Sequence, residues 1–272
     1  MNKKTLYVTD LDGTLLTNDK KITPFSRRTL DALIERGALI TYATARSYVS
    51  ARQIIGDFEP KIPVIIYNGT FILDLKTGEK LLIDSFSSED VCEIKALLEE
   101  NDIYPFVYAT VDGEERFSYV KGQTSLGQEH FLSEHKGDKR ENPVEHNRLY
   151  LGEVFHFTIM GDEALLKELC SALEIKYECV CYKEQYSGDW WLEIHPKGAS
   201  KASAIKKLKA LLGAHRVVCF GDGKNDASMF EACDECYAVE NADEPLKKIA
   251  TGIIPSNEDD GVARWLLEHI KL

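Results

Sequence analysis

Three short apolar runs near the start of the chain constrain the fold most strongly. They cover residues 5–9, 38–43 and 64–67, and their apolar residues follow one another instead of alternating with polar ones. Such runs are typical of parallel strands that are covered on both faces. A helix that begins at Pro24 and another over residues 48–55 separate them. The order strand, helix, strand, helix, strand predicts an α/β fold with a doubly wound parallel sheet.

The middle of the chain has a different pattern, which reads as α+β. Its expected elements are a helix at 88–100, strands at 104–109, 117–121 and 155–160, a polar surface stretch at 133–148 and a helix at 162–173. The first pattern then returns, with a helix at 201–212, a strand at 216–220, a helix at 226–232, a strand at 237–239 and a helix at 262–270. We therefore predict one core domain, residues 1–84 and 189–272, interrupted by an inserted α+β domain, residues 85–188.

Composition narrows the kind of protein. Apolar residues make up 44% of the 272 residues, and no run approaches the roughly 20 apolar residues that span a bilayer. The N-terminal apolar stretch is too short for a secretory signal, so we expect a cytoplasmic protein with no membrane partner. The net charge of −12 argues against nucleic acid as a partner, because nucleic-acid binding normally needs a basic face. The sequence leaves monomer and homodimer equally open.

The seven cysteines include two closely spaced pairs, Cys179 with Cys181 and Cys233 with Cys236. A zinc site usually needs four ligands, and no second pair lies beside either of these in the sequence. We therefore expect reduced thiols that bind no zinc.

Two carboxylates directly follow the first predicted strand, in the segment TDLDGTLL at residues 9–16. If the chain stays extended there, Asp10 and Asp12 point to the same side, because side chains of a strand alternate. Carboxylates this close repel each other unless they share a cation or a proton. Magnesium prefers oxygen ligands and would resolve the repulsion, so both residues are candidate metal ligands. Taken alone, the segment also fits an ordinary acidic turn.

The segment TYATARS at residues 41–47 follows the second predicted strand. Thr44 offers a hydroxyl, Arg46 offers a charged donor, and the backbone around Ala45 leads into the start of a helix. Together they form a candidate phosphate-binding loop. A threonine at this place is also a common helix cap.

Two segments of the last third complete the set of candidates. Lys201 opens a predicted helix, where its charge slightly opposes the helix dipole; this favours a role in offsetting carboxylate and phosphoryl charge. The segment FGDGKND at 220–226 follows an apolar strand. Asp222 can complete the magnesium site, Asp226 can orient the ligands from behind, and Asn225 is a candidate substrate-binding residue. Every residue of this segment also suits a simple tight turn.

The order of these segments resembles the haloacid dehalogenase superfamily of phosphohydrolases, and within it the Cof-type group with a large inserted cap. The resemblance covers essentially the whole chain, and DLDGTLL combined with GDGKND is highly specific. YNGT at 67–70 resembles the Asn-Gly turn of the group, which places Asn68 near the substrate. SNEDDGVA at 256–263 resembles its closing segment, in which Asn257 supports the metal loop. Ala45 departs from the group, which often has glycine there.

The resemblance implies a Rossmann-like core and a magnesium-dependent phosphatase. Asp10 would be the nucleophile that becomes phosphorylated, and Asp12 would be the general acid and base. Thr44 and Lys201 would bind the phosphate. Magnesium would be held by Asp10, by the backbone carbonyl of Asp12 and by Asp222. The substrate would be a small phosphate ester, and the superfamily acts on sugar phosphates, nucleotides, flavin mononucleotide and pyridoxal phosphate.

Three other functions share part of this pattern. A phosphomutase would use the same nucleophile but would shield its phospho-enzyme from water. A receiver-like phospho-acceptor combines acids, threonine and lysine around magnesium, but needs neither Asp12 as acid and base nor a large insertion. A haloacid dehalogenase would not need the acidic metal cluster.

The inserted domain is expected to act as a lid that selects the leaving group. Tyr186, Trp190 and Trp191 lie near its predicted end and are candidates for substrate contact. Core or hinge packing is the more common role of such aromatic residues.

Overall fold

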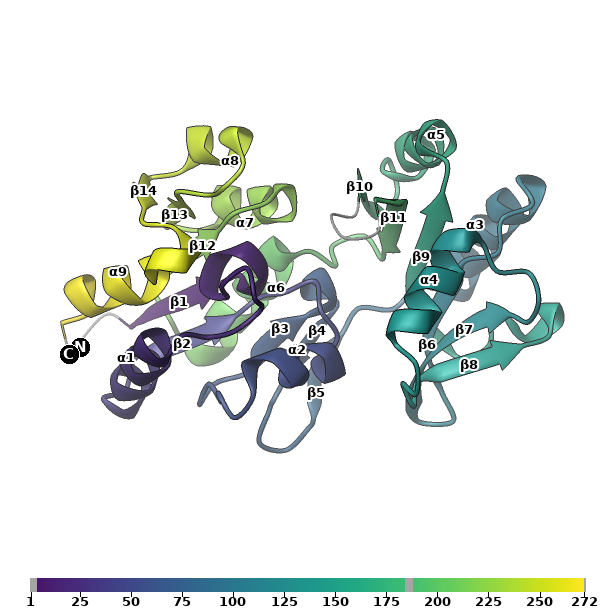
Figure 1. Ribbon diagram of the computed structural model, residues 1–272. Helices are drawn as coiled ribbons and strands as arrows, with labels where there is room; N and C mark the ends of the chain where they lie inside the picture. The colour runs from purple at the N-terminus through teal and green to yellow at the C-terminus, as the bar shows by residue number, and fades with distance from the viewer. Residues whose placement is uncertain (1–3, 184–187, 272) are drawn as a thin grey trace. The chain divides into compact units, whose positions relative to one another are not determined.

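The computed structural model describes residues 4–183 and 188–271. The chain divides into two compact units, one formed by Met1–Ile83 with Ala199–Leu272 and the other by Asp84–Gly198 (Figure 1). In the described part of the chain, no helix combines the length and apolar character that a membrane crossing needs. Tyr186 lies outside the described residues.

The first unit contains the predicted parallel sheet. Its five strands run in the order β14-β13-β12-β1-β2, and every neighbouring pair is parallel. Their bounds are β1 Thr5–Thr9, β2 Leu39–Tyr42, β12 Arg216–Gly221, β13 Glu235–Val239 and β14 Gly252–Ile254. The doubly wound α/β prediction is confirmed. The side chains of Leu6, Val8 and Phe220 are fully buried, as expected for strands covered on both faces.

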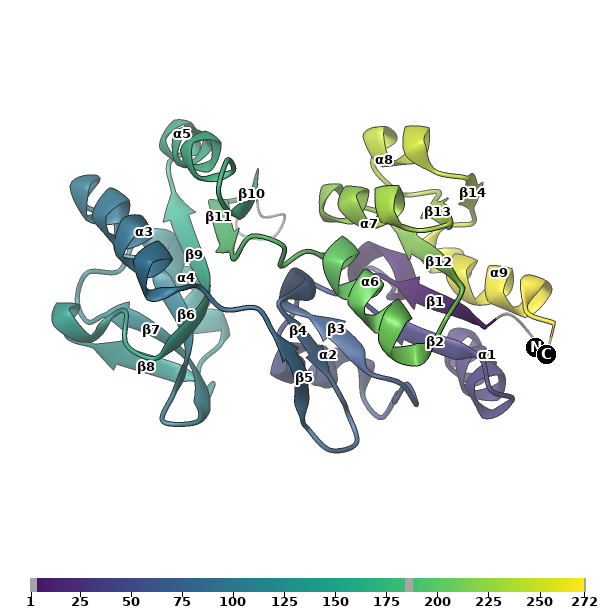
Figure 2. The same cartoon turned by 180° about the vertical axis from the view of Figure 1, so that it is seen from behind.

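Helices cover both faces of this sheet. Opposite views show α1 and α9 on one side and α6 and α7 on the other (Figure 1 and Figure 2). The helices of the unit are α1 Pro24–Glu35, α2 Tyr48–Ile55, α6 Lys201–Leu212, α7 Ala227–Ala232, α8 Glu244–Ile249 and α9 Gly261–His269. Thr23 caps α1 by accepting a hydrogen bond from the backbone of Ser26, with Pro24 in the first turn. The sequence signals for this helix start are therefore confirmed.

The third apolar run departs from the prediction. Strand β3 (Val64–Ile66) is not one of the five strands but pairs antiparallel with β4 (Phe71–Leu73), which pairs with β5 (Lys80–Ile83). Within the described residues, its parallel pairing with the β2 segment is a single bridge between Ala43 and Ile65. The cause is the tight turn after β3, where Tyr67 and Asn68 take positive φ angles of 49° and 52° and reverse the chain.

The second unit is a six-stranded sheet with the order β10-β11-β9-β6-β7-β8. Its elements are α3 Ser88–Glu100, β6 Phe106–Val111, β7 Glu114–Val120, α4 Leu126–Glu134, β8 Glu141–Val144, β9 Glu153–Gly161, α5 Glu163–Leu173, β10 Glu178–Lys183 and β11 Trp190–His195. The polar stretch expected only at the surface contributes the edge strand β8, which runs parallel to β7. The other neighbouring pairs are antiparallel.

The second boundary of the insertion differs from the predicted one. Residues 189–198 belong to the inserted unit, because β11 pairs with both β9 and β10 and completes their sheet. Trp190 and Trp191 are therefore residues of that sheet. The chain returns to the first unit at Ala199 instead of residue 189.

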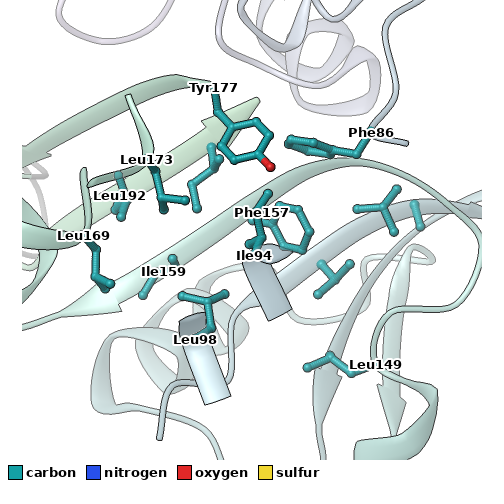
Figure 3. Packing of buried hydrophobic residues seen from close by; sticks show 14 of the residues in the cluster. Phe86, Ile94, Leu98, Leu149, Phe157, Ile159, Leu169, Leu173, Tyr177 and Leu192 are labelled. Atoms are coloured by element: carbon teal, nitrogen blue, oxygen red, sulfur yellow. The ribbon is translucent and has the colours of Figure 1, made fainter. Parts of the chain in front are cut away.

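A hydrophobic cluster holds the inserted unit together (Figure 3). Ile94 and Leu98 of α3 are fully buried in it, against Phe157 of β9 and Leu169 of α5. Phe86 joins the cluster just after the chain enters the unit, and its ring centroid lies 5.1 Å from that of Phe157. The insertion therefore has a core of its own and does not depend on the first unit for apolar burial.

We expect Leu98→Ala to lower the free energy of unfolding of the inserted unit by about 2–5 kcal/mol, because it leaves a cavity in this cluster. The measurement is chemical denaturation followed by tryptophan fluorescence. Leu126→Ala is the matched control, since Leu126 is 84% exposed on α4 and its loss should change stability by about 0.5 kcal/mol or less. Equal effects of the two substitutions would contradict the packing described above.

Candidate active site

The carboxyl ends of three neighbouring strands bring together residues that are distant in the sequence. Asp10 follows β1, and its backbone N–H donates to the carbonyl of Phe220 on β12 at 2.9 Å. Asp222 follows β12, and Thr44 follows the β2 segment, where the N–H of Ala43 donates to Thr9 on β1 at 2.9 Å. The three side chains therefore lie at one edge of the sheet, which is where open α/β sheets bind ligands.

A buried lysine links two of the carboxylates. Lys201, the first residue of α6, places its Nζ 2.5 Å from Oδ1 of Asp10 and 2.7 Å from Oδ1 of Asp226. Exposed fractions are 1% for Lys201, 4% for Asp10 and 0% for Asp226. A buried charge survives only when it is paired, so these three groups depend on one another.

The charges of the cluster shift one another's protonation. Burial raises the pKa of Asp10 well above its usual range, the carboxylates of Asp226 and Asp222 raise it further, and Lys201 opposes the rise. Burial, followed by the charge of Asp226, raises the pKa of Asp222 to about 7. For Lys201, burial lowers the pKa, but attraction to Asp10 and Asp226 outweighs burial and raises it above the ordinary value. The site therefore holds more negative charge than its one lysine can balance.

The turn after Asp10 fits closely against Asp222. Thr14 Oγ1 donates to Oδ1 of Asp222 at 3.0 Å. Gly13 has φ +72°, and a Cβ there would lie 2.3 Å from Oδ2 of Asp222. Only glycine allows this approach, which explains the Gly-Thr pair in DLDGTLL.

Asp226 holds the loop that carries Asp222. Its Oδ2 accepts hydrogen bonds from the backbone N–H groups of Asp222 at 3.0 Å and Gly223 at 3.2 Å. Its other oxygen, Oδ1, contacts Lys201, so both carboxylate oxygens are held. This fits the predicted role of a residue that orients metal ligands without binding the metal itself. Asn225 lies half-buried on the same single turn, Lys224–Asp226.

Arg46, which is predicted to bind phosphate, forms an ion pair with Asp12. Its Nε and Nη2 donate to the two carboxylate oxygens of Asp12, each at 2.6 Å, and its Nη1 donates to Ser50 at 2.8 Å. The side chain of Asp12 is 44% exposed, in contrast to buried Asp10. The arginine therefore holds the second carboxylate of the pair, and its role in phosphate binding stays a prediction.

The loop after β2 is tied to the start of α6. Thr44 is buried, its Oγ1 accepts from the backbone N–H of Arg46 at 3.2 Å, and its carbonyl accepts from Asn68 N–H at 2.9 Å. Half-buried Ala45 lies between the two loop residues. Gly69, with φ +106°, lies so close to Ser200 that a Cβ would be 2.2 Å from its carbonyl oxygen. The turn carrying Asn68 thus packs beside the residue that precedes Lys201.

Two asparagine side chains, Asn257 of the closing segment and Asn241, support the turn that follows Asp10. Asn257 Nδ2 donates to the carbonyl of Leu16 at 2.9 Å, and its N–H donates to Asn241 Oδ1 at 3.0 Å. Asn241 Nδ2 in turn donates to the carbonyl of Gly13 at 2.7 Å. Sequence analysis missed Asn241, which follows β13 at the same sheet edge; its position after an apolar strand was the available signal.

The acidic cluster fits a hard divalent cation. Asp10, Asp222 and Asp226 each offer an oxygen, and these oxygens lie within 4.8 Å of one another. The raised pKa values of Asp10 and Asp222 are what uncompensated carboxylates show, and all-oxygen ligands suit magnesium.

A buried carboxylate beside a lysine, at the carboxyl edge of a parallel sheet, is the arrangement of an α/β enzyme that handles phosphoryl groups. The family model of haloacid dehalogenase-like hydrolases matches residues 7–266. The chain therefore belongs to the haloacid dehalogenase-like hydrolase family, and its predicted membership is confirmed.

Two characterised relatives align over nearly their full lengths. The 5-amino-6-(5-phospho-D-ribitylamino)uracil phosphatase YitU of Bacillus subtilis is 28% identical over 276 residues, covering 99% of each chain. The pyridoxal phosphate phosphatase YbhA of Escherichia coli is 26% identical over 268 residues, covering 96% of this chain and 97% of that protein. The chain is accordingly a phosphatase of this family, that is, a phosphoric monoester hydrolase.

Solved structures match the whole chain as well. A haloacid dehalogenase-like hydrolase from Bacteroides thetaiotaomicron is 28% identical with a TM-score of 0.76, and the match covers 99% of this chain and 100% of that one. A protein from Thermotoga maritima is 25% identical with a TM-score of 0.77, covering 99% and 98%. The core fold with an insertion is thus shared with known members of the family.

We expect Lys201→Met to destabilise the protein by about 3–5 kcal/mol near pH 8 in the presence of a chelator, because Asp10 and Asp226 lose their buried counter-charge. The loss should shrink near pH 5. The pKa of Asp10 is raised in the folded protein, so its ionisation destabilises the fold progressively as pH rises. The penalty for losing Lys201 is therefore smaller at the lower pH. Chemical denaturation at the two pH values measures this.

The control is Lys206→Met, an exposed lysine of the same helix. Its stability should be close to that of the unaltered protein at both pH values. If Lys201→Met behaved like this control, the buried ion pairs would not have the importance assigned to them.

Proposed function

We propose that the chain hydrolyses a small phosphorylated metabolite, a sugar phosphate or similar phosphomonoester, through an aspartyl-phosphate on Asp10, with magnesium. The observation that carries the proposal is the position of Asp10. It is buried at the carboxyl edge of the sheet, 2.5 Å from Lys201, in a cluster that has excess negative charge. A bound cation would offset the negative charge of this cluster and allow Asp10 to approach a phosphoryl group.

Asp10 is the proposed nucleophile. One of its carboxylate oxygens attacks phosphorus in line, the ester bond breaks, and the alcohol oxygen leaves with the bonding electron pair. Lys201 offsets part of the charge that builds up around the transferred group, since it already lies in contact with Asp10. Thr44 and the backbone N–H of Ala45 are proposed to bind the phosphoryl oxygens, with the side chain of Asn68 near the substrate. Asn225 is proposed to contact the substrate from the opposite loop.

Asp12 is the proposed general acid and base. It gives a proton to the leaving alcohol oxygen, then takes one from the water that attacks the aspartyl-phosphate and releases inorganic phosphate. Its half-exposed side chain suits exchange with a substrate. Arg46 donates hydrogen bonds to both oxygens of Asp12, and an incoming phosphate would compete for the same guanidinium.

Magnesium is proposed to be held by Asp10, Asp222 and the backbone carbonyl of Asp12. Asp226 has both oxygens committed to Lys201 and to two backbone N–H groups, so we assign it the role of fixing the Asp222 loop. Asn257 supports the opposite turn through the carbonyl of Leu16. When bound, the ion would offset the repulsion between the carboxylates and the phosphoryl group.

The substrate is proposed to be a small molecule. The substrates in the names of the two relatives, a ribitylaminouracil phosphate and pyridoxal phosphate, are phosphate esters of small metabolites and support this class. The net charge of −12 disfavours nucleic acid, and we propose a cytoplasmic site of action.

A panel of phosphate esters tests the function. We expect phosphate release with magnesium and none with chelator, and we expect Asp10→Asn to abolish turnover while leaving the protein folded. Asp19→Asn, an exposed aspartate nearby, should keep full activity and is the control. Wild-type-like turnover by Asp10→Asn, with deamidation excluded by mass spectrometry, would overturn the nucleophile assignment.

The products separate the proposed phosphatase from its alternatives. Conversion of a sugar phosphate into its isomer without phosphate release would indicate a phosphomutase. A stable phospho-form without turnover would indicate a phospho-acceptor module.

We expect the affinity for magnesium to rise with pH up to about pH 7, because the proton on Asp222, whose pKa is raised to about 7, must leave before the metal binds. Below that point each pH unit should cost about tenfold in apparent affinity for one displaced proton. Isothermal titration calorimetry at about pH 5.5, about pH 7 and about pH 8 gives the affinities. Repeating it in buffers of different ionisation enthalpy gives the number of released protons. An affinity that is independent of pH across this range would contradict the prediction.

A further inference from the structure

Two histidines and a glutamate lie together in the inserted unit, in a cluster that the phosphatase chemistry does not use. His156 is on β9, and Glu193 and His195 are on the neighbouring strand β11. Strand register pairs Glu193 with Thr158 and Ile194 with Phe157, which brings His195 beside His156. Glu193 and His195 are two residues apart on one strand and so share a face of the sheet. We call these three residues the His2Glu cluster.

The His2Glu cluster is buried and compact. Exposed fractions are 4% for His156, 8% for Glu193 and 1% for His195. One ligand atom from each residue lies within 4.8 Å of the other two, and the imidazole centroids are 4.3 Å apart. Polar groups of this kind are costly to bury unless something binds them together.

Distances inside the cluster suit a shared ion. His195 Nε2 lies 3.6 Å from Oε2 of Glu193, which is longer than an ordinary hydrogen bond. Bonds of about 2.0–2.2 Å from zinc to histidine nitrogen and carboxylate oxygen would place two tetrahedral ligands roughly 3.4 Å apart. A small adjustment therefore allows both atoms to bind one cation.

Neighbouring side chains already orient the candidate ligands. Tyr182 donates from its hydroxyl to Oε1 of Glu193 at 3.0 Å, which leaves Oε2 on the side of His195. Thr158 Oγ1 lies 2.9 Å from Nε2 of His156 and so helps to fix the orientation of that ring. Hydrogen bonds of this kind fix ring orientation and tautomer in metal sites.

We propose that the His2Glu cluster is a second metal site, which binds a zinc ion through His156, Glu193 and His195. Two imidazoles and one carboxylate suit a borderline divalent metal such as zinc, whereas the all-oxygen set at Asp10 and Asp222 suits magnesium. The ion would link β9 to β11, and its remaining coordination position would take water or a small anion.

The test uses the full chain in excess magnesium, so that the oxygen site is already filled. Cobalt(II) serves as a spectroscopic probe of the site and zinc as the metal itself. We expect one equivalent of either metal, and for cobalt(II) the visible d–d bands of a low-coordinate nitrogen and oxygen site. Zinc X-ray absorption of the unaltered protein should show histidine ligands and no sulfur, although the chain has seven cysteines.

Near-isosteric variants locate the site. Glu193→Gln and His156→Gln should each lower the affinity for cobalt(II) by more than about a hundredfold, since loss of a ligand exceeds the effect of losing an orienting partner. His130→Gln, an exposed histidine of the same unit, should bind cobalt(II) like the unaltered protein.

Two results would overturn the proposal. One is no binding of zinc or cobalt(II) by the unaltered protein in excess magnesium. The other is binding with sulfur ligands, or binding that Glu193→Gln retains at unchanged affinity while its circular dichroism shows a folded protein. The measurements on the unaltered protein decide the question even if a variant does not fold.

Discussion

The buried ammonium group of Lys201 is the contact on which the site depends. It contacts both Asp10 and Asp226 directly, and the three residues come from the start of α6, the end of β1 and the loop after β12. Replacing such a buried network with apolar side chains often leaves a protein equally or more stable, so stability alone gives no reason to keep it. The ion pairs fix the positions of the carboxylate oxygens, and groups fixed in advance are what enzymes use to stabilise developing charge.

Much of this could be predicted from the sequence, because local signals and global arrangement agree. Continuous apolar runs indicated parallel strands, and parallel strands collect the residues after them at a single edge. That topological rule was enough to predict that Asp10, Thr44 and Asp222 lie close together. Thr23 and Pro24 marked the start of α1 in the same way, through the hydrogen bonds that a first helical turn needs.

The rest depended on contacts that local patterns do not encode. The sheet of β3 was misassigned because Tyr67 and Asn68 adopt positive φ angles that are uncommon for residues other than glycine. The contact between Arg46 and Asp12 was not foreseen, because a long side chain can reach several partners and sequence spacing does not decide among them. The His2Glu cluster was invisible because its members come from two strands whose register only the folded sheet sets.

Gly13 and Gly69 lie where a single methyl group would collide with Asp222 and with the backbone of Ser200. At each of these glycines, two segments that are distant in the sequence approach so closely that only the hydrogen atom of a glycine fits between them. Every amino-acid substitution at these two positions introduces a larger side chain and therefore a steric conflict. Changes of sequence that leave these loops undisturbed must fall at other positions.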